Sequence, residues 1–188
     1  NEVHGLTGGG GFDFMNFRGK GQLFSIKYNR GLSSQNQYSN ATNNNNQDYQ
    51  SFSIRFKENR IFDTRNSIDV SYSHTEQGVS SSSIYEYDIV SNYGSIGFGR
   101  SFEWPDNYFR GDWALRIRNT KYLGTISALD NSFSNSDIIA DDEIYGHVTK
   151  KGISITQVIS RDSRNHPTFP TFGSTFAWIS TLSGDILG

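Results

Sequence analysis

Alternation of apolar and polar residues recurs along most of the chain and limits what it can fold into. In "FSIKYN" the side chains of Phe24, Ile26 and Tyr28 share one face of an extended strand. The stretches "FSIRFK" and "SIDVSYS" repeat the pattern. Because successive side chains of a strand point to opposite faces, a period of two predicts strands with one apolar and one polar face. Helical spacing is rare, so we expect an all-β protein.

The same pattern predicts about eight strands, and their length is unusual. The expected strands cover residues 5–17, 21–33, 47–59, 65–77, 84–102, 108–122, 148–162 and 174–186. Strands of globular proteins have about 5 or 6 residues, whereas a strand that crosses a bilayer at a tilt needs about 9 to 11. We therefore expect an antiparallel up-and-down transmembrane β-barrel.

The connections between these strands alternate in length. Short ones are expected at 18–20, 60–64, 103–107 and 163–173, and long polar ones at 33–47, 76–83 and 127–143. Outer-membrane barrels have short periplasmic turns and longer external loops. In that orientation the first strand runs from outside to inside, so we expect at least one strand before residue 1.

Aromatic residues and all three prolines gather at the short connections. "RNHPTFPTFGSTF" at 164–176 combines two prolines with three phenylalanines, whereas an ordinary solvated turn has few aromatics. A ring of aromatic side chains at headgroup depth explains this composition. The residues expected in that ring are Phe17, Phe62, Trp104, Tyr108, Phe109, Phe169 and Phe172.

The overall composition excludes several classes of protein. The 188 residues have a net charge of −2 and no cysteine, which argues against a nucleic-acid field, disulfide frameworks and thiolate metal sites. Hydrophobic residues make up 34% and aromatic residues 14%, a balance that fits a wall with one polar face. No apolar run is long enough for a transmembrane helix, and the first residues do not form a signal peptide.

The alternation also assigns side chains to the two faces of the predicted barrel. The residues expected to face the lumen are Lys27, Arg55, Lys57, Asp69, Arg110, Asp112, Arg116 and Arg118. The residues expected to face lipid are Phe24, Ile26, Tyr28, Phe52, Ile54, Phe56, Trp113, Leu115, Ile117 and Trp178. Two interpretations of the lumen charges remain open. They either compensate one another in a wetted interior, or they guide unfolded chains or anchor an inner loop.

Motifs for catalysis or metal binding are weak. The four histidines lack metal-ligand spacing, and no GxSxG turn marks a nucleophile, so we predict no enzyme, no metal site and no cofactor. "GLTGGGGF" at 5–12 lacks the Lys-Ser/Thr of a phosphate-binding loop. In a barrel strand its glycines permit either curvature or fraying.

Two of the long connections carry further patterns. The acids of 127–143 do not match the calcium-loop spacing, so we expect a solvated loop there. "NATNNNNQ" contains a formal glycosylation acceptor, and we expect it to be a flexible external loop.

Three stretches resemble the barrel domain of the Omp85 superfamily, most closely its BamA assembly-factor family. They are "NFRGKGQ" (16–22), "YQSFSIRFKENRIFDTRNSIDVSYS" (49–73) and "SRDSRNHPTFPTFGST" (160–175). In that superfamily one strand ends in Asn-aromatic-x-Gly-x-Gly, and a later hairpin carries an Asp-x-Arg…Phe-Pro-Thr-x-Gly-Ser turn. The second pattern is formed here by Asp162, Arg164, Phe169, Pro170, Thr171, Gly173 and Ser174.

The resemblance covers residues 1–188 and implies roughly strands two to nine of a sixteen-stranded barrel, with the periplasmic POTRA domains and the closing strands lying outside this chain. It implies an outer-membrane protein of Gram-negative bacteria that inserts barrel precursors without covalent chemistry. The implied partners are unfolded outer-membrane protein precursors, accessory periplasmic lipoproteins and membrane lipid, with no nucleic acid. The alternatives are a translocation or secretion pore of the same superfamily, and a self-contained anchor or adhesin barrel.

Overall fold

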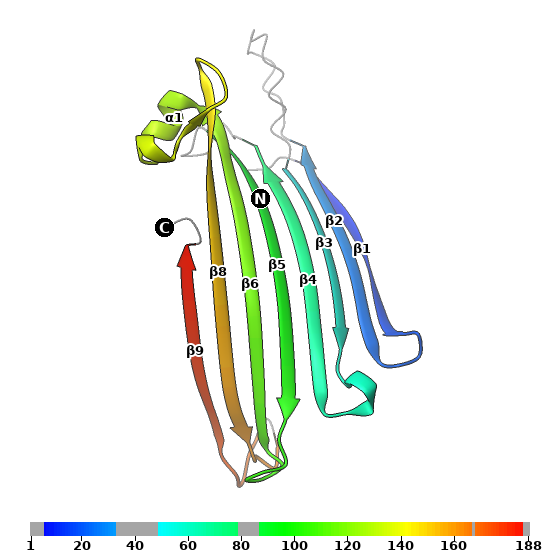
Figure 1. Cartoon of the computed structure of the whole chain (residues 1–188). Helices are drawn as coiled ribbons and strands as arrows, with labels where there is room; N and C mark the ends of the chain where they lie inside the picture. Colours follow the sequence, from blue (N-terminus) through cyan, green and yellow to red (C-terminus); the bar gives the residue numbers. More distant parts are fainter. Residues whose placement is uncertain (1–5, 33–48, 79–86, 167, 186–188) are drawn as a thin grey trace.

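In a computed structural model that describes residues 6–32, 49–78, 87–166 and 168–185, the chain forms one antiparallel sheet. The strand order is β1-β2-β3-β4-β5-β6-β8, and both β7 and β9 pair with β8 (Figure 1). The long strands are β1 (Leu6–Phe17), β2 (Gln22–Leu32), β3 (Tyr49–Glu58), β4 (Asn66–Gln77), β5 (Tyr87–Ser101), β6 (Phe109–Thr125), β8 (Tyr145–Asp162) and β9 (Thr175–Asp185). The short elements are η1 (Ile61–Asp63), α1 (Ile126–Asp130), η2 (Asn135–Asp137) and β7 (Ile139–Ala140).

The predicted all-β antiparallel architecture is confirmed, and each long strand lies within or close to an expected segment. The largest differences are at the ends of β6 and β8, which continue to Thr125 and begin at Tyr145. These ends pair with each other, Thr125 opposite Tyr145, beyond the point where the alternation of the sequence predicts a strand. Pairing between two strands extends them where the side-chain pattern gives no signal.

The register between the strands arranges the side chains in continuous rows. One row crosses the eight long strands with an apolar residue on each: Phe14, Phe24, Phe56, Val70, Ile96, Leu115, Ile155 and Leu182. The neighbouring row, one residue away on each strand, is polar throughout: Asp13, Ser25, Arg55, Ser71, Ser95, Arg116, Ser154 and Ser183. Adjacent residues of a strand point to opposite faces, so the sheet has one apolar face and one polar face. We call the eight long strands the wall.

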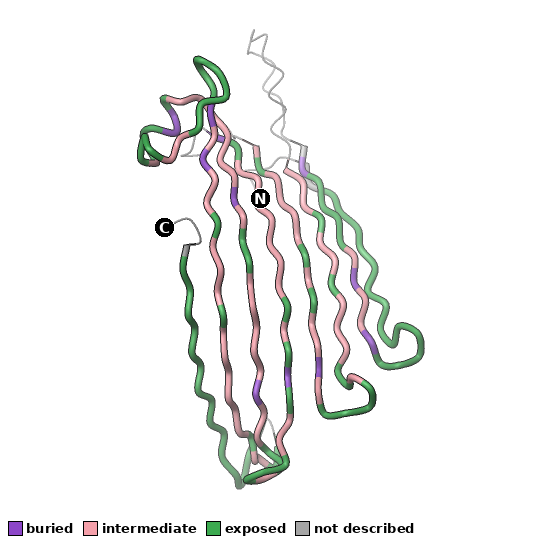
Figure 2. Tube along the Cα trace, in the orientation of Figure 1, coloured by how far each residue is buried: buried purple, intermediate pink, exposed green. Residues whose placement is uncertain are grey.

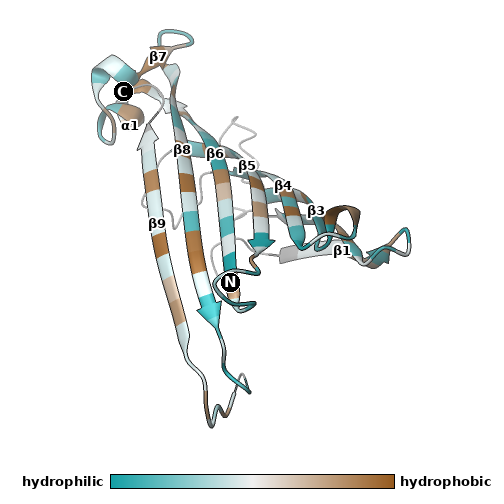
Figure 3. Ribbon diagram, turned by 60° about the horizontal axis from the view of Figure 1, so that its bottom comes forward, coloured by the Kyte–Doolittle hydropathy of each residue, from teal (hydrophilic) through white to brown (hydrophobic). Residues whose placement is uncertain are grey.

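The wall is a single layer, and its described residues bury little surface. Buried positions are few and scattered along the strands, while the short turns are exposed (Figure 2). Figure 3 shows that the sheet is strongly curved and that hydrophobic and hydrophilic residues alternate along β8 and β9. Among the described strands, β1 and β9 lie at opposite ends of the sheet and do not pair with each other, so the sheet is not closed.

The two kinds of connection lie at opposite ends of the wall. The turns after β1, β3, β5 and β8 lie at the lower end in Figure 1, and the connection that contains α1 lies at the upper end. The predicted connections 33–47 and most of 76–83 lie outside the described residues, but the strands that they join meet at the upper end too. The expected alternation of short and long connections along the chain is therefore present.

The connection between β6 and β8 differs from the expected solvated loop. We call residues 126–144 the cap. Its Leu129 is 0% exposed and belongs to the small hydrophobic core, together with Tyr87 of β5 and Val148 of β8. Phe133 of the cap packs with its ring 4.7 Å from that of Tyr122. By register Tyr122 and Val148 belong to the polar face, so the cap lies against the upper end of that face.

The polarity of the cap explains why the sequence pattern predicts a solvated loop there. Its exposed acids dominate the sequence pattern, whereas its apolar residues occupy irregular positions that match neither a helix nor a strand period. The helix α1 is short and begins at Ile126, directly after Thr125, whose side chain accepts a hydrogen bond from the Ala128 N–H at 3.3 Å. Contacts with the wall, which are not visible in the sequence, hold this segment in place.

Part of the glycine-rich stretch of β1 has a packing reason, since a Cβ atom would be crowded at Gly9 and Gly11 but would meet nothing within 4 Å at Gly8 and Gly10. A Cβ atom at Gly11 would lie 2.8 Å from the Ile26 carbonyl oxygen of β2, closer than real Cβ atoms approach. The pairing of β1 with β2 is continuous from Leu6 to Met15. This geometry favours close approach of the two backbones in a curved sheet over fraying.

We predict that Leu129→Ala loosens the cap. Removing a fully buried leucine side chain costs about 2 to 5 kcal/mol, and the loss falls on the cap because the strands keep their own hydrogen bonds. Hydrogen exchange at the amides of the cap should accelerate, while exchange in the centre of β6 stays the same. Ile144→Ala is the matched control, since Ile144 belongs to the same connection and is 62% exposed. Equal effects of the two variants would contradict a packed cap.

Candidate functional site

The polar face of the wall carries all eight residues that the sequence predicted for the lumen. The register brings Lys27, Arg55, Lys57, Asp69, Arg110, Asp112, Arg116 and Arg118 to one face. They come from β2, β3, β4 and β6, so strands far apart in the sequence contribute to one surface. That this surface encloses water remains a prediction.

Two carboxylates on the polar face are held by arginines. The Nε atom of Arg55 donates to both carboxylate oxygens of Asp69 at 3.1 Å, and its Nη2 also contacts Asp69. Arg110 donates through Nε to both oxygens of Asp112, at 3.0 and 2.8 Å, and through Nη2 to the hydroxyl of Ser67 at 3.0 Å. The negative charges of this part of the face are therefore already paired.

Two hollows lie along the polar face. The lower one has a volume of about 410 Å³ and a lining that extends from Arg55 of β3 to Thr156 of β8, which shows that the sheet is concave on this face. The upper one has a volume of about 650 Å³ and is lined mainly by β6 and β8. Tyr93 and Arg116 line both hollows, so the two form one continuous depression.

The opposite face carries the ten residues that the sequence predicted for lipid. The register places Phe24, Ile26, Tyr28, Phe52, Ile54, Phe56, Trp113, Leu115, Ile117 and Trp178 on it. Several are strongly exposed, such as Trp178 at 54%. Trp113 stacks on Phe98 of the neighbouring strand, with ring centroids 6.1 Å apart. A continuous exposed apolar surface of this kind needs a partner that excludes water.

The turn at residues 163–174, which we call the proline turn, is held by side chains outside the predicted site residues. Asn165 accepts hydrogen bonds through Oδ1 from the N–H groups of Thr171, at 3.0 Å, and Phe172, at 3.2 Å. His166 accepts through Nδ1 from the N–H groups of Thr168 and Phe169, at 3.2 and 3.1 Å. Both residues lie inside the motif, between Arg164 and Phe169, and side-chain acceptors at the start of a turn are a recognisable signal.

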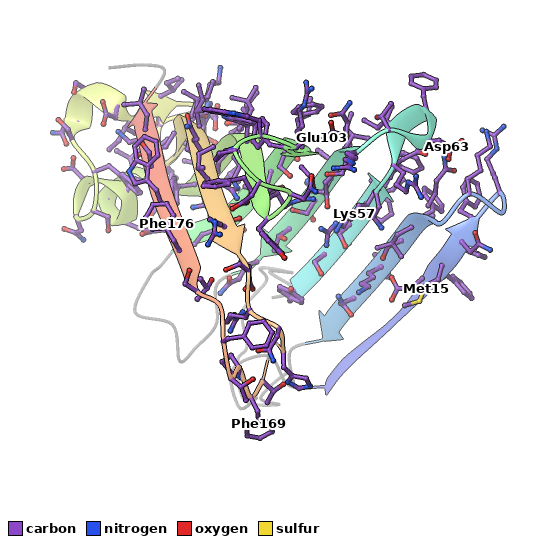
Figure 4. The ribbon with its side chains drawn as sticks, turned by 90° about the horizontal axis from the view of Figure 1, so that it is seen from below. Met15, Lys57, Asp63, Glu103, Phe169 and Phe176 are labelled. Atoms are coloured by element: carbon purple, nitrogen blue, oxygen red, sulfur yellow. The ribbon has the colours of Figure 1, made fainter. Side chains whose placement is uncertain are left out.

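Within the family motif, each polar residue has a structural partner. Gly173 has φ +93°, and a Cβ atom there would lie 2.2 Å from the Ser163 carbonyl oxygen, so only glycine fits. Thr171 accepts from Asn165 Nδ2 at 2.9 Å, and Ser174 donates its N–H to the Ser163 hydroxyl at 3.1 Å. Phe169 is 79% exposed and projects from the turn away from the strands (Figure 4), and Pro170 is also exposed.

Asp162 and Arg164 complete the motif with an ion pair at the start of the turn. Asp162 is the last residue of β8, beyond the last row of apolar side chains. Arg164 donates to it through Nε at 2.8 Å and Nη2 at 2.6 Å, and its backbone N–H donates at 3.2 Å. These bonds lower the pKa of Asp162 to about 2. The carboxylate therefore stays ionised at any physiological pH.

Arg161, which is not among the predicted site residues, links the proline turn to the neighbouring short turn. Its Nε donates to Asp106 at 2.8 Å, and its Nη1 donates to the hydroxyls of Ser163 and Ser174 at 3.0 and 3.1 Å. Its guanidinium also lies 5.7 Å from the ring centre of Tyr108. By register Arg161 is on the apolar face, level with Phe176, where its charge is balanced by Asp106.

In the part of the chain that the structure describes, the histidines lie apart from one another. Three of the predicted scattered histidines are described, and each contacts different elements: His74 pairs with Glu76, His147 with Asp141, and His166 with its own turn. No group of three potential metal ligands occurs among residues 6–32, 49–78, 87–166 and 168–185. Within the same ranges, no helix has the length and hydrophobicity to cross a membrane.

Comparisons with known proteins agree with the fold. Residues 16–188 match the family model described as the Omp85 superfamily domain. The search of curated proteins and the search of solved structures gave no match. The match covers the wall from the end of β1 onward and includes the two turn motifs, at 16–22 and 160–175.

We predict a low-pH transition in the proline turn. The folded-state pKa of Asp162 lies below its unfolded value of about 3.9, so its stabilisation of the turn is complete above that value and is lost as the pH falls towards 2. In NMR spectra of the whole protein in detergent, the Arg164 Nε–H resonance should move with a midpoint near pH 2. Asp162→Asn should abolish this transition. A midpoint near the unfolded value would show that the ion pair is absent.

Proposed function

We propose that this chain, which belongs to the Omp85 superfamily, forms part of an outer-membrane wall that inserts barrel proteins. Membership of the superfamily supports a role in membrane-protein insertion or in protein translocation, in an outer membrane of bacterial or organellar type. Members of the superfamily are assembly or translocation proteins without enzymatic activity. The observation that carries the proposal is that residues 16–188, which match the superfamily, form a curved wall with an apolar and a polar face.

The more specific proposal is a BamA-type insertase of a Gram-negative outer membrane. A wall of paired strands can offer backbone N–H and C=O groups to an incoming strand wherever its own seam is poorly paired. It also disturbs the lipid beside it, which lowers the barrier to insertion. Its clients would be unfolded outer-membrane protein precursors, and accessory periplasmic lipoproteins and lipid would be its other partners. The two turn motifs are shared by the superfamily, and it is the resemblance of the three stretches 16–22, 49–73 and 160–175 to the BamA family that supports this assignment.

The proposed placement puts the apolar face in hydrocarbon. The stretch 109–117 of β6 carries Phe109, Trp113, Leu115 and Ile117 on that face, and its length is close to the about 9 to 11 residues that cross a bilayer at a tilt. Above it the same face turns polar at Asn119. Below it lie the exposed aromatics of the short turns, which suit the headgroup region. The polar face then lines an aqueous lumen.

A translocation or secretion pore is the second candidate, and the two joined hollows on the polar face favour it. A continuous depression lined by charged side chains suits the passage of an extended chain. Conductance distinguishes the candidates. A full-length protein that is open at rest in a planar bilayer and is blocked by one soluble passenger would be a pore.

We predict that a lysine is costly on the apolar face and tolerated on the polar face. Leu115→Lys should lower the free energy of unfolding in a bilayer by about 2 to 4 kcal/mol, since the charge enters hydrocarbon. Ala114→Lys is the matched control, because Ala114 is the adjacent residue and lines the lower hollow. Urea titration of the full-length protein in liposomes measures both. Equal losses, or a larger loss for Ala114→Lys, would contradict the proposed placement.

We predict that the full-length protein in liposomes accelerates the folding of an unfolded barrel precursor. A tenfold acceleration over empty liposomes corresponds to a barrier lowered by about 1.4 kcal/mol. Folding is followed by the heat-modifiable migration of the precursor in gels. Liposomes that contain an unrelated barrel at the same density are the control for simple disturbance of lipid. Equal rates in the two kinds of liposome would contradict insertase activity.

A further inference from the structure

Positive charge on the polar face is not balanced along β6 and β8. The lower hollow is lined by four cations, Arg55, Lys57, Arg110 and Arg116, and by two carboxylates, Asp69 and Asp112, which are already bound to Arg55 and Arg110. The side chains that the structure describes in the lining of the upper hollow include cations and no acid. Asp185 of β9 lies in the same row as Arg118, two strands away, since both are in register with Gly152. The excess is therefore positive, and it increases towards the upper end of the wall. We call Arg116 and Arg118 of β6 and Lys150 of β8, which line the upper hollow, the basic stripe.

The members of the basic stripe differ in how far they are already bonded. Arg116 donates through Nη1 to the hydroxyl of Thr156 at 2.7 Å, a neutral acceptor that leaves its charge uncompensated. Arg118 has no ion pair or side-chain hydrogen bond with any other residue in the described ranges. Arg118 is exposed, so it can reach a partner without rearrangement of the wall.

An acidic side chain already binds one end of the stripe. Asp137 of the cap accepts a hydrogen bond from Nζ of Lys150 at 2.7 Å. This pair shows which chemistry the stripe accepts: a carboxylate carried on polypeptide that lies against the polar face. Lys150 is opposite Thr120, and Arg118 and Arg116 lie two and four residues below Thr120 on the same face, so they continue the same line of donors.

We propose that the basic stripe binds an extended acidic polypeptide segment, with two carboxylates on alternate residues contacting Arg116 and Arg118. Two residues along a strand span about 6.6 Å, so side chains on the same face of an extended segment repeat at the spacing of the two arginines. Guanidinium groups bind carboxylates through paired hydrogen bonds, which favours this ligand over a neutral chain. The inference rests on the proposed function, because it requires that the polar face lines a lumen, and it names a class of segment that passes or docks there.

The test measures binding to the full-length protein in detergent micelles. The probe is a fluorescein-labelled peptide of alternating threonine and glutamate, and the reference peptide has glutamine in place of glutamate. Arg116→Gln with Arg118→Gln should weaken binding of the glutamate peptide about tenfold and leave the weak binding of the glutamine peptide unchanged. The control is Lys20→Gln with Lys121→Gln, which removes the same charge from a turn and from the apolar face and should change the affinity less than twofold.

Three outcomes would overturn the proposal. They are equal affinities of the two double variants, equal binding of the two peptides, and displacement of the glutamate peptide by inorganic phosphate, or by anionic lipid dissolved in the same micelles, at a concentration equal to that of the peptide's carboxylates. If the double variant fails to fold, Arg118→Gln alone serves, since Arg118 is exposed and should still lose several-fold in affinity. No insertion takes place in micelles, so a failure of the peptide-binding assay leaves the insertase proposal intact. If the peptide binds but the liposome folding assay fails, only the proposal for the basic stripe is supported.

Discussion

Hydrogen bonding between neighbouring strands is the interaction on which the wall depends. A single layer has no second sheet to pack against, so each strand is held by the strands beside it. The pairing is unbroken along β2 to β6 and β8, and it sets one register for the whole sheet. A slip of one residue would move every side chain of a strand to the other face. The apolar row through Leu115 and the polar row through Arg116 therefore exist together or not at all.

The lower end of the wall shows how a one-layer structure stabilises its turns. Arg161 bonds to Asp106 and to the serines of the proline turn, and so ties two hairpins together. Asn165 accepts hydrogen bonds from two backbone N–H groups of the turn that would otherwise bond to water. The hydrogen bonds of these polar side chains thus fix the backbone of the turn, while Phe169 and Phe172 stay exposed. In the proposed orientation, these aromatic side chains meet the lipid headgroups.

The cap covers the upper end of the polar face, and the face is open below it. At the upper end the cap buries Leu129 and Val148 completely and makes the small hydrophobic core of the described chain. Below it lie the hollows, with paired charges near Asp69 and Asp112 and an excess of cations along β6 and β8. Charges compensate one another at Asp69 and Asp112, which are paired with Arg55 and Arg110. A role of the basic stripe in binding a polypeptide stays a proposal.

The alternating sequence by itself determined the class of fold, the approximate limits of the long strands and the sharing of faces, because a strand period of two is a local property of the chain. The turn motif likewise indicated the Omp85 superfamily. The sequence did not determine the cap, whose Leu129 is buried only because β5 and β8 lie beside it. Nor could it identify Arg161, Asn165 or the unbalanced stripe. Their partners come from distant residues or from the exact fold of a turn, and the tertiary structure alone brings those atoms within bonding distance.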